Sequence, residues 1–587
     1  MSLTKKSNFQ VLIKVFALTK DFKHYIWLAV FTTLLLALVS PIRPWLIQKA
    51  INEYAASNQL DGLQFIALML LMLIILGTLL QFFNDYITGW IAQKVILVLR
   101  MKVFNHVLKN RLTYYDNTPV GTLTTRTVSD IETVSELFAE GIITILGDVL
   151  QIIAISFFML YIDWKLTLIS LSVLPILFYS SHVFRIKVKE SFHEVRNAVS
   201  NLNSFVQEQI TGIHITQVFN QNKKVYNEFE KINQQHYTAN HKSVMYYSVF
   251  FPVLEVITSI SVALLILYSA NRLKINHQFD YGVITAFILY INMFFRPVRI
   301  LADRFNNIQM GIVASERLFT LLENNELLEN NSGTTKKTIV GEIEFKDVCF
   351  SYNDKQEVLK NVSFSLKNGE TLAIIGSTGA GKSTIVNLIT DLYPIQSGKI
   401  KIDGIEHTLY DKQSLRSQIS VVNQDVFLFS GSVYENINLG NNDVSKEQVL
   451  KLIDEIQVLD FVQKLPNGLD YKVMERGNTL SAGQKQIISL VRTIISNPKV
   501  IILDEATSSV DTETEKIIQK TINYLLEKRT GIVIAHRLST IKKADKIMFL
   551  DKGNVLEYGT NEELLNQKGH YYHWLNSSVF SEKAKIH

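Results

Sequence analysis

The sequence predicts an all-α domain that spans a membrane, followed by an α/β domain. The 587 residues are too many for one hydrophobic core, and the composition changes along the chain. Long apolar runs fill roughly the first half, whereas the second half has the composition of a soluble domain. There, Gly376–Thr384 (Gly-Ser-Thr-Gly-Ala-Gly-Lys-Ser-Thr) stands between a strand-like run, Thr371–Ile375, and a helix-like run, Ser383–Leu392. The expected fold is an all-α six-helix transmembrane domain followed by an α/β P-loop NTPase domain.

Composition limits the classes of partner. The net charge of +5 is small for this length, and no block of Lys and Arg alternates with aromatic residues, so we do not expect nucleic acid binding. Cys349 is the one cysteine, which excludes an internal disulfide framework. The expected domains are residues 1–24 (an interfacial helix), 25–320 (six spans with two long cytoplasmic extensions), 321–340 (a linker), 341–576 (a nucleotide-binding domain) and 577–587 (a tail).

Six apolar segments predict the spanning helices, since each approaches the roughly 20 residues that a span requires. Buried helices of a soluble bundle are the alternative, but such helices would show a polar face. The segments are Tyr25–Leu46, Leu63–Phe83, Gly141–Ile162, Leu166–Phe184, Val249–Leu267 and Tyr281–Ile300. Before them, Phe9–Leu18 has the spacing of a helix at the membrane interface or of a plain first core helix.

The basic residues predict the orientation of the spans. Lys and Arg concentrate in the N-terminus and in the two long connections, 91–140 and 185–248. The positive-inside rule therefore places both termini, both connections and the nucleotide domain in the cytoplasm, with the chain in the cytoplasmic (inner) membrane. Each long connection reads as two helices that turn near Tyr115–Gly121 or Gly212, and the turns are candidate contacts with the nucleotide domain. Flexible loops are the alternative.

The polar and the aromatic residues within the spans each have two interpretations. Intramembrane polar groups mark either a pathway or a paired structural contact; here they are Asp148, Gln151, Glu255, Asn292 and Arg296. An aromatic lining suggests amphipathic cargo, with contact to membrane lipids as the alternative; its members are Phe82, Phe83, Phe157, Phe158, Phe287 and Phe294. Four prolines are expected to kink their helices: Pro41, Pro44, Pro175 and Pro252.

The phosphate loop predicts a nucleotide site. Its glycines let the backbone curl until successive N–H groups point at one anion, and the helix N-terminus adds partial positive charge. Lys382 is placed to reach the outer phosphates, and the Ser383 hydroxyl is placed to ligate Mg²⁺.

Two strand-like runs further along end in residues suited to hydrolysis. Val500–Leu503 leads into Asp504, which can hold Mg²⁺ through water, and Glu505, which can polarise an attacking water. His536 ends the other run, where it can bond the γ-phosphate, although a lone histidine is also an ordinary surface residue. Leu480–Gln484 precedes a helix and suits either an anion site or an ordinary N-cap.

Together these residues resemble an ATP-binding cassette (ABC) ATPase, and the resemblance to the family covers nearly the whole chain, from about Phe9 to Trp574. In the family's order they match its Walker A (Gly376, Ser377, Thr378, Gly379, Ala380, Gly381, Lys382, Ser383, Thr384), Q-loop (Gln424), signature (Leu480–Gln484), Walker B (Asp504, Glu505), D-loop (Ser509–Asp511) and H-loop (His536). Tyr352 matches the aromatic that stacks on adenine. The six spans and the two turns resemble those of an exporter-type half-transporter, similar to the lipid A flippase and bacterial multidrug exporters.

The resemblance implies a mechanism. Two copies would face head to tail, so that each ATP lies between one phosphate loop and the other copy's Ser481, Gly483 and Gln484. Asp511 of the D-loop would also belong to the nucleotide-binding residues. Glu505 would be the general base, His536 its partner, and Gln424 the sensor of Mg²⁺ and γ-phosphate. Mg²⁺ would be held by Ser383, Gln424 and Asp504. Closure of the two cassettes would switch the spans from inward- to outward-facing and export amphipathic molecules or lipids.

One position departs from the family. The second signature position is usually glycine and is Ala482 here, beside an intact Ser481 and Gly483; we expect a competent site. A subunit of a heterodimeric exporter, an importer and an ABC-type channel or regulator remain alternatives on the same fold.

Overall fold

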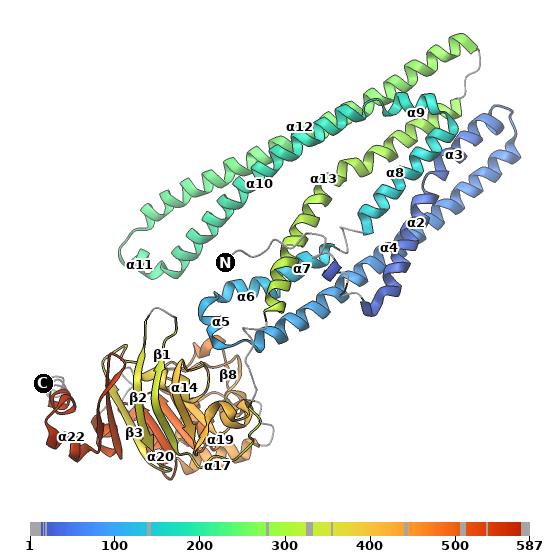
Figure 1. Cartoon of the computed structure of the whole chain (residues 1–587). Helices are drawn as coiled ribbons and strands as arrows, with labels where there is room; N and C mark the ends of the chain where they lie inside the picture. Colours follow the sequence, from blue (N-terminus) through green and yellow to red (C-terminus); the bar gives the residue numbers. More distant parts are fainter. Residues whose placement is uncertain are drawn as a thin grey trace. The chain divides into compact units, whose positions relative to one another are not determined.

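The computed structural model describes residues 13–15, 17, 20–137, 143–276, 281–324, 333–353, 356–439, 444–504, 512–535 and 538–576, and their side chains except at 273–276, 298–306, 475, 512 and 539. The chain forms two compact units. Unit 1 comprises Met1–Leu108 and Pro119–Asn325; unit 2 comprises Lys109–Thr118 and Glu326–His587. Thus a short piece of the first long connection belongs to the nucleotide unit. Figure 1 shows the order of the elements along the chain.

Unit 1 begins with a span that is broken in the middle. A turn of 3₁₀-helix, η1 (Lys20–Phe22), leads into α2 (Lys23–Val39), α3 (Ile42–Lys49) and a short π-helix, η2 (Ala50–Ala55). The break between α2 and α3 coincides with Pro41, as the sequence predicts, because proline cannot donate a backbone hydrogen bond. The hydroxyl of Tyr290, fully buried, donates to the Pro41 carbonyl oxygen at 2.7 Å and so ties α13 (Tyr281–Glu323) to the start of α3.

The first long connection differs from its prediction. α4 (Leu60–Leu108) does leave the membrane as one long helix, but the return is divided into α5 (Leu112–Asn117), α6 (Val120–Thr127) and α7 (Ser129–Glu136). The prediction of a single long return helix was therefore wrong. Pro119 fixes the break before α6, and the threonine-rich sequence of α6 has low helix propensity because β-branched side chains lose rotamer freedom.

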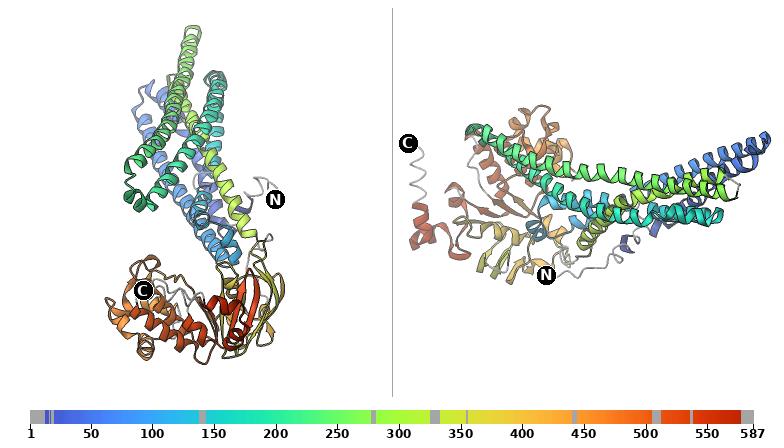
Figure 2. Two further views of the ribbon diagram at one scale, coloured as in Figure 1. Left: turned by 90° about the vertical axis from the view of Figure 1, so that its left-hand side faces the viewer. Right: turned by 90° about the horizontal axis from the view of Figure 1, so that it is seen from above.

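The second long connection agrees with its prediction. After α8 (Ile143–Ile162) and α9 (Trp164–Leu171), α10 (Leu174–Thr211) ends at Gly212, and a short α11 (Ile213–Val218) joins it to α12 (Asn222–Asn276). Figures 1 and 2 show α10 and α12 side by side, and they contact each other over their length. α13 (Tyr281–Glu323) completes the unit.

Five helices among the described residues are long and apolar enough to cross a membrane: Lys20–Ala55, Leu60–Leu108, Ile143–Ile162, Trp164–Thr211 and Asn222–Arg272. The chain is thus a multi-pass membrane protein. The sixth predicted span, Tyr281–Ile300, is helical as the first part of α13 but is not among these five. The count of six is therefore not confirmed.

The structure differs from the sequence predictions for two kinds of side chain within the spans: aromatic residues and a polar residue. Phe287 and Phe294 are 0% and 5% exposed in a core between α8, α9, α10, α12 and α13, so in this structure they do not line a path. Asn84 of α4, which the sequence analysis passed over, accepts hydrogen bonds from Thr32 and Thr33 of α2 at 2.9 Å each. This buried polar cluster joins the first two spans, because hydrogen bonds replace water in a helix interface.

The described residues of unit 2 form three sheets. A four-stranded sheet has the order β2-β1-β4-β5, a six-stranded sheet the order β12-β11-β3-β10-β9-β6, and β7 pairs with β8. The strands are β1 (Ile343–Phe350), β2 (Leu359–Leu366), β3 (Thr371–Gly376), β4 (Ser397–Ile402), β5 (Ile405–Glu406), β6 (Ile419–Val422), β7 (Gly431–Ser432), β8 (Lys472–Val473), β9 (Val500–Asp504), β10 (Thr530–Ile534), β11 (Lys546–Asp551) and β12 (Asn554–Gly559).

The six-stranded sheet is covered on both faces. Along β3, Leu372 and Ile374 enter one core, whereas Ala373 and Ile375 enter another. Such burial on both faces explains the uninterrupted apolar runs of these strands. The described helices of unit 2 are α14 (Lys382–Ile389), η5 (His407–Leu409), α15 (Lys412–Arg416), α16 (Val433–Asn438), α17 (Lys446–Glu455), α18 (Leu459–Gln463), η6 (Gly468–Asp470), η7 (Glu475–Gly477), α19 (Ala482–Ser496), α20 (Thr512–Leu526), α21 (Leu538–Lys543) and α22 (Asn561–Gln567). Helices such as α19 and α20 pack on one face of the sheet, and α14, α15 and the four-stranded sheet pack on the other.

The predicted linker, 321–340, is only partly a linker. α13 continues to Glu323, and at the other end Ile339 is 1% exposed within a core of unit 2. The backbone N–H of Ile339 donates to the Gln418 side chain at 2.8 Å. The nucleotide unit therefore begins before the expected residue 341.

Candidate functional site

Strand order brings the separate sequence motifs to one edge of the six-stranded sheet. β3, β10, β9 and β6 are parallel neighbours in that order. The phosphate loop follows β3, Asp504 ends β9, and Gln424 follows β6 in an exposed turn. The carboxyl ends of parallel strands form the ligand-binding edge of such sheets. Asp511, Glu505 and His536 lie outside the described residues, but the strands before Glu505 and His536, β9 and β10, end at this edge.

The phosphate loop requires glycine at two positions. Gly381 has φ +105°, and a Cβ there would stand 2.6 Å from the Cδ2 atom of Leu359. At Gly376 a Cβ would stand 2.0 Å from the backbone oxygen of Leu550 on the neighbouring strand β11. Since that oxygen belongs to a sheet ladder, it has no room to move. The sequence motif is thus also a steric requirement.

We expect Gly376→Ala to fold poorly around the loop and to lower ATP affinity at least about tenfold, because the added methyl group must displace the backbone of β3 or β11. Gly404→Ala is the matched control, since Gly404 also has positive φ (+76°) but open space around its Cβ position. Titration with a fluorescent ATP analogue measures both. Equal affinities of the two variants would contradict the steric assignment.

Lys382 is a buried cation at the loop. Its side chain is 9% exposed, and Nζ donates to the backbone oxygens of Gly376 and Ser377 at 2.9 Å each. Burial lowers the pKa of Lys382, and the nearby Asp504 carboxylate partly opposes that shift. An anion beside Nζ would favour the charged ammonium. The geometry and the electrostatics therefore fit a phosphate ligand.

Some polar side chains around the loop have partners within the chain, whereas another is exposed and can bind a ligand. The Ser377 hydroxyl donates to Asp551 at 2.9 Å, and Thr384 is buried with its hydroxyl 3.2 Å from that of Tyr352. Ser383 is exposed, so its hydroxyl is available to a metal ion. Thr378 and Gly379 are exposed at the tip of the loop, and Ala380 is buried beneath it. The donor set of Ser383 and Asp504 fits Mg²⁺, which prefers hydroxyl, carboxylate and water oxygens.

Tyr352 lies beside α14, close to the phosphate loop. Its hydroxyl accepts a hydrogen bond from Asn387 of α14 at 3.2 Å, and its ring makes edge-to-face contacts with Phe350 and Tyr393. Tyr352 is nonetheless 44% exposed, which leaves ring surface for a flat ligand. This position is compatible with the stacking role that the resemblance implies.

Ser481 is the N-cap of α19, so the N-cap interpretation of this segment is confirmed. Its hydroxyl accepts from the backbone N–H of Gln484 at 3.2 Å, and the Gln484 side chain accepts from the N–H of Ser481 at 2.9 Å. This reciprocal pair is a capping box. Ser481 and Ala482 are exposed, whereas Gly483 is buried. The methyl group of Ala482 therefore meets no packing obstacle within the chain.

The nucleotide unit also contains Tyr393, which the sequence analysis missed. Its hydroxyl donates to Asp116 of α5 at 2.6 Å. This bond confirms that the turn at Tyr115–Gly121 contacts the nucleotide domain. A single tyrosine in a loop has no periodicity or motif, so no sequence signal pointed to it.

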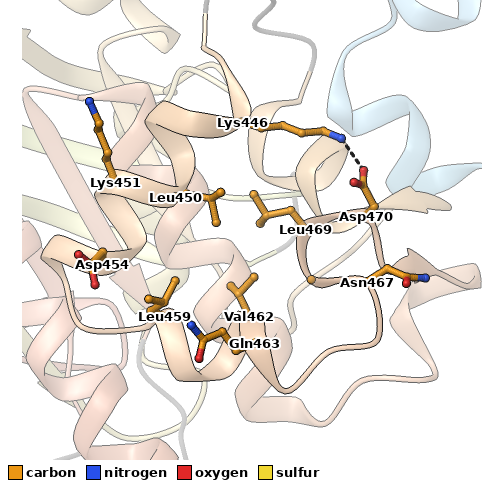
Figure 3. A pocket seen from close by; sticks show the side chains of 11 residues that line it. Lys446, Leu450, Lys451, Asp454, Leu459, Val462, Gln463, Asn467, Leu469 and Asp470 are labelled. Carbon is orange, nitrogen blue, oxygen red and sulfur yellow. Dashed lines mark hydrogen bonds and ion pairs between the residues drawn. The ribbon is translucent and has the colours of Figure 1, made fainter.

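Figure 3 shows a shallow pocket elsewhere in this unit, between α17, α18 and η6. Apolar side chains form its floor, and the ion pair of Lys446 with Asp470 (2.6 Å) closes one side. None of the predicted nucleotide residues lines it. The lining residues are Lys446, Leu450, Lys451, Asp454, Leu459, Val462, Gln463, Asn467, Gly468, Leu469 and Asp470.

Comparison with known proteins agrees with both units. Residues 26–298 match the model of the ABC transporter transmembrane region, and residues 359–508 match the ABC transporter model of the ATP-binding part. An uncharacterized ABC transporter ATP-binding protein of Bacillus subtilis, YknV, is 40% identical over 82% of this chain and 80% of its own length. A putative ABC transporter ATP-binding protein of Streptococcus pneumoniae, exp8, is 33% identical over 97% of each chain.

A third relative carries a more specific name. The probable multidrug resistance ABC transporter ATP-binding/permease protein YheH of Bacillus subtilis is 34% identical over 85% of this chain and 74% of its own length. The two matched models, the relatives and the edge that collects the nucleotide motifs lead to one conclusion: this chain belongs to the ABC transporters, with the transmembrane region and the ATP-binding region fused in one polypeptide.

Proposed function

We propose that the chain is one half of a dimeric exporter that uses ATP binding and hydrolysis to move lipids, drugs or other amphipathic molecules out of the cytoplasm. The observation that carries the proposal is the combination, on one chain, of candidate membrane spans with a sheet edge that gathers the nucleotide motifs. Relatives named for multidrug export at 32–34% identity support the direction and the kind of cargo.

In this proposal the residues of the sheet edge divide the work. Lys382 and the N–H groups of the phosphate loop bind the β- and γ-phosphates, and Tyr352 stacks on the adenine. Ser383, Asp504 and Gln424 would hold Mg²⁺, which neutralises phosphate charge when bound. Glu505 accepts the proton of the attacking water, and His536 holds Glu505 and the water in place.

A second copy would complete each site. The N-terminus of α19, a 15-residue helix, is exposed at Ser481 and Ala482, and its first N–H groups and positive dipole end favour an anion. We propose that this end faces the γ-phosphate bound by the other copy, in a head-to-tail pair. Asp511 would lie at the same interface.

Exposed apolar side chains suggest how the second copy engages the cytoplasmic helices. Ile215 and Phe219, in and just after α11, are 60% and 66% exposed, and Phe427 and Phe429 of the nucleotide unit are 54% and 57% exposed. Exposed apolar groups of this kind mark interaction sites. We propose that α11 of one copy docks on Phe427 and Phe429 of the other, so that closure of the ATP sites moves the spans between inward- and outward-facing states.

This docking predicts a cross-link. With Cys349 replaced by serine, the pair Ile215→Cys and Phe429→Cys is expected to form a disulfide between two chains, visible as a dimer on a non-reducing gel. Each single cysteine, and the pair Ile215→Cys with Leu450→Cys, are the controls, because Leu450 is exposed on α17 instead. A disulfide within a single chain would contradict the proposal that α11 docks on the nucleotide unit of the other copy.

The function is tested by the Mg²⁺-dependent ATPase activity of this chain alone, purified and reconstituted in nanodiscs. We expect sustained turnover, and stimulation by some members of a panel of lipids and cationic drugs. Turnover without any partner supports a homodimer. A folded chain that binds ATP but stays silent would reject the homodimer and favour a heterodimeric exporter. Transport of a stimulating compound into inverted vesicles would exclude an importer and a channel.

A further inference from the structure

The Tyr393–Asp116 hydrogen bond connects the nucleotide unit to a segment that continues directly into the membrane helices. α5, which carries Asp116, follows α4 along the chain and precedes α6. The bond, at 2.6 Å, is short, and its acceptor is a carboxylate, so it belongs to the stronger class of hydrogen bonds. Leu112 of α5 also packs against the same core as Tyr393. α5 is therefore fixed to the nucleotide unit by both a polar and an apolar contact.

Three aromatic rings link this bond to the expected adenine site. Tyr393 is 4% exposed and lies edge-to-face with Tyr352, with ring centroids 5.1 Å apart and planes at 90°. Phe350 contacts both, at 4.9 Å from Tyr352 and 5.9 Å from Tyr393. Because close-packed rings have little free volume, a change in the position of Tyr352 must be shared by Tyr393.

Tyr393 is also tied to the phosphate loop through the chain. It follows the end of α14 at Ile389 by four residues, and α14 begins at Lys382. Tyr393 thus contacts a ring expected to hold the base, follows the helix that leads from the phosphates, and bonds to α5. Tyr393 belongs to none of the nucleotide motifs described above.

We propose that Tyr393 is a positioning residue that transmits nucleotide occupancy at Tyr352 and α14 to α5. The inference rests on the proposed function, because it requires a nucleotide at the phosphate loop. A base stacked on Tyr352 fixes the three-ring cluster, and the fixed cluster holds the Tyr393 hydroxyl at Asp116. A hydrogen bond weakens steeply over a displacement of about 1 Å, so occupancy of the site changes how firmly α5 is held.

The hydroxyl keeps its donor role at physiological pH. Burial, and then the hydrogen bond to the Asp116 carboxylate, raise the pKa of Tyr393 well above its ordinary value. The proton therefore stays on the phenol oxygen, and the bond does not switch off as pH changes around neutrality.

Hydrogen–deuterium exchange on the full chain in nanodiscs tests the proposal, with and without saturating Mg²⁺ and a non-hydrolysable ATP analogue. In the unmodified chain we expect nucleotide to slow exchange of the peptide over Leu112–Asn117 by about fivefold, the factor that one hydrogen bond provides. In Tyr393→Phe and Asp116→Ala this slowing should disappear, while nucleotide still protects the peptide over Lys382–Ile389. Asp116→Asn keeps an acceptor oxygen and should retain most of the effect.

Tyr410→Phe is the matched control. Tyr410 lies in the same core as Tyr393, is 1% exposed and donates to the backbone oxygen of Ile402 at 3.0 Å, so its loss has a similar structural cost. A purely structural role of Tyr393 would speed exchange of α5 equally with and without nucleotide and leave the ratio unchanged. That result, or an unchanged ratio in Tyr393→Phe for any other reason, overturns the proposal.

The design separates this inference from the proposed function. If nucleotide fails to protect the phosphate-loop peptide of the unmodified chain, the proposed function fails. If that peptide is protected but α5 is not, the chain binds nucleotide and only the role of Tyr393 is wrong.

Discussion

Replacement of Glu505 by glutamine is expected to lower kcat for ATP hydrolysis by at least about 100-fold, and to leave ATP affinity within a factor of a few. Glutamine keeps the shape of the side chain but cannot accept the proton of the attacking water, and general bases contribute on the order of 10²–10⁴-fold. Glu505 directly follows Asp504 in the sequence, and Asp504 ends β9 at the edge that holds the phosphate loop. The measurement is single-turnover hydrolysis beside equilibrium binding of ATP.

Two further variants make this result interpretable. Glu513→Gln changes an exposed carboxylate in the first turn of α20, to which no role in hydrolysis is assigned, and should retain most of the activity. Asp504→Asn should weaken the dependence on Mg²⁺ instead, because Asp504 is proposed to hold the metal ion. Hydrolysis by Glu505→Gln at more than about a tenth of the normal rate would remove Glu505 as the base, since a general base contributes more than that factor.

Replacement of Lys382 by methionine is expected to weaken ATP binding by about 10- to 100-fold, the range that a hydrogen bond to a charged group provides. The same change should leave the free protein as stable as before or more stable. Methionine has a similar volume and no charge, and burial of the ammonium is unfavourable, as its lowered pKa indicates. Binding is measured by titration, and stability by the thermal midpoint without nucleotide.

Lys399→Met is the control for charge. Lys399 is exposed on β4 and paired with Glu406 at 2.6 Å, so its loss should change neither nucleotide affinity nor stability by much. If Lys382→Met binds ATP as tightly as the unmodified chain, the phosphate-binding role of Lys382 is wrong.

The pKa of Lys382 also gives the sign of a pH effect. Burial lowers this pKa in the free chain, and a phosphate beside the ammonium would raise it on binding. ATP affinity is therefore highest at pH values below the lowered pKa that Lys382 has in the free chain. It falls as the pH rises from that pKa toward the higher pKa that Lys382 has in the complex. In Lys382→Met this alkaline loss should be absent.

The sequence alone determined the fold class, the nucleotide motifs and the existence of membrane spans. These features depend on local chemistry: the length of an apolar run, the glycines of one loop, two acids at the end of a strand. The motif alone identifies Gly376 and Gly381, although the groups that exclude a Cβ there belong to Leu359 and Leu550, elsewhere in the chain. The turn at Gly212 also follows from the chain itself, because glycine ends a helix with little regard to distant neighbours.

Only the tertiary structure decided which distant residues meet. Tyr393 and Asp116 are 277 positions apart. Asp116 lies in a turn that the sequence predicts as a contact, but no sequence pattern identifies Tyr393 as its partner. The sequence suggests that Phe287 and Phe294 line a path for cargo, but both are buried in the core of unit 1. Apolar character does not determine which aromatic side chains are buried; the packing of the helices does. The assignment of Lys109–Thr118 to the nucleotide unit likewise rests on contacts between distant parts of the chain. Local patterns specify elements, whereas contacts across the chain depend on how those elements pack.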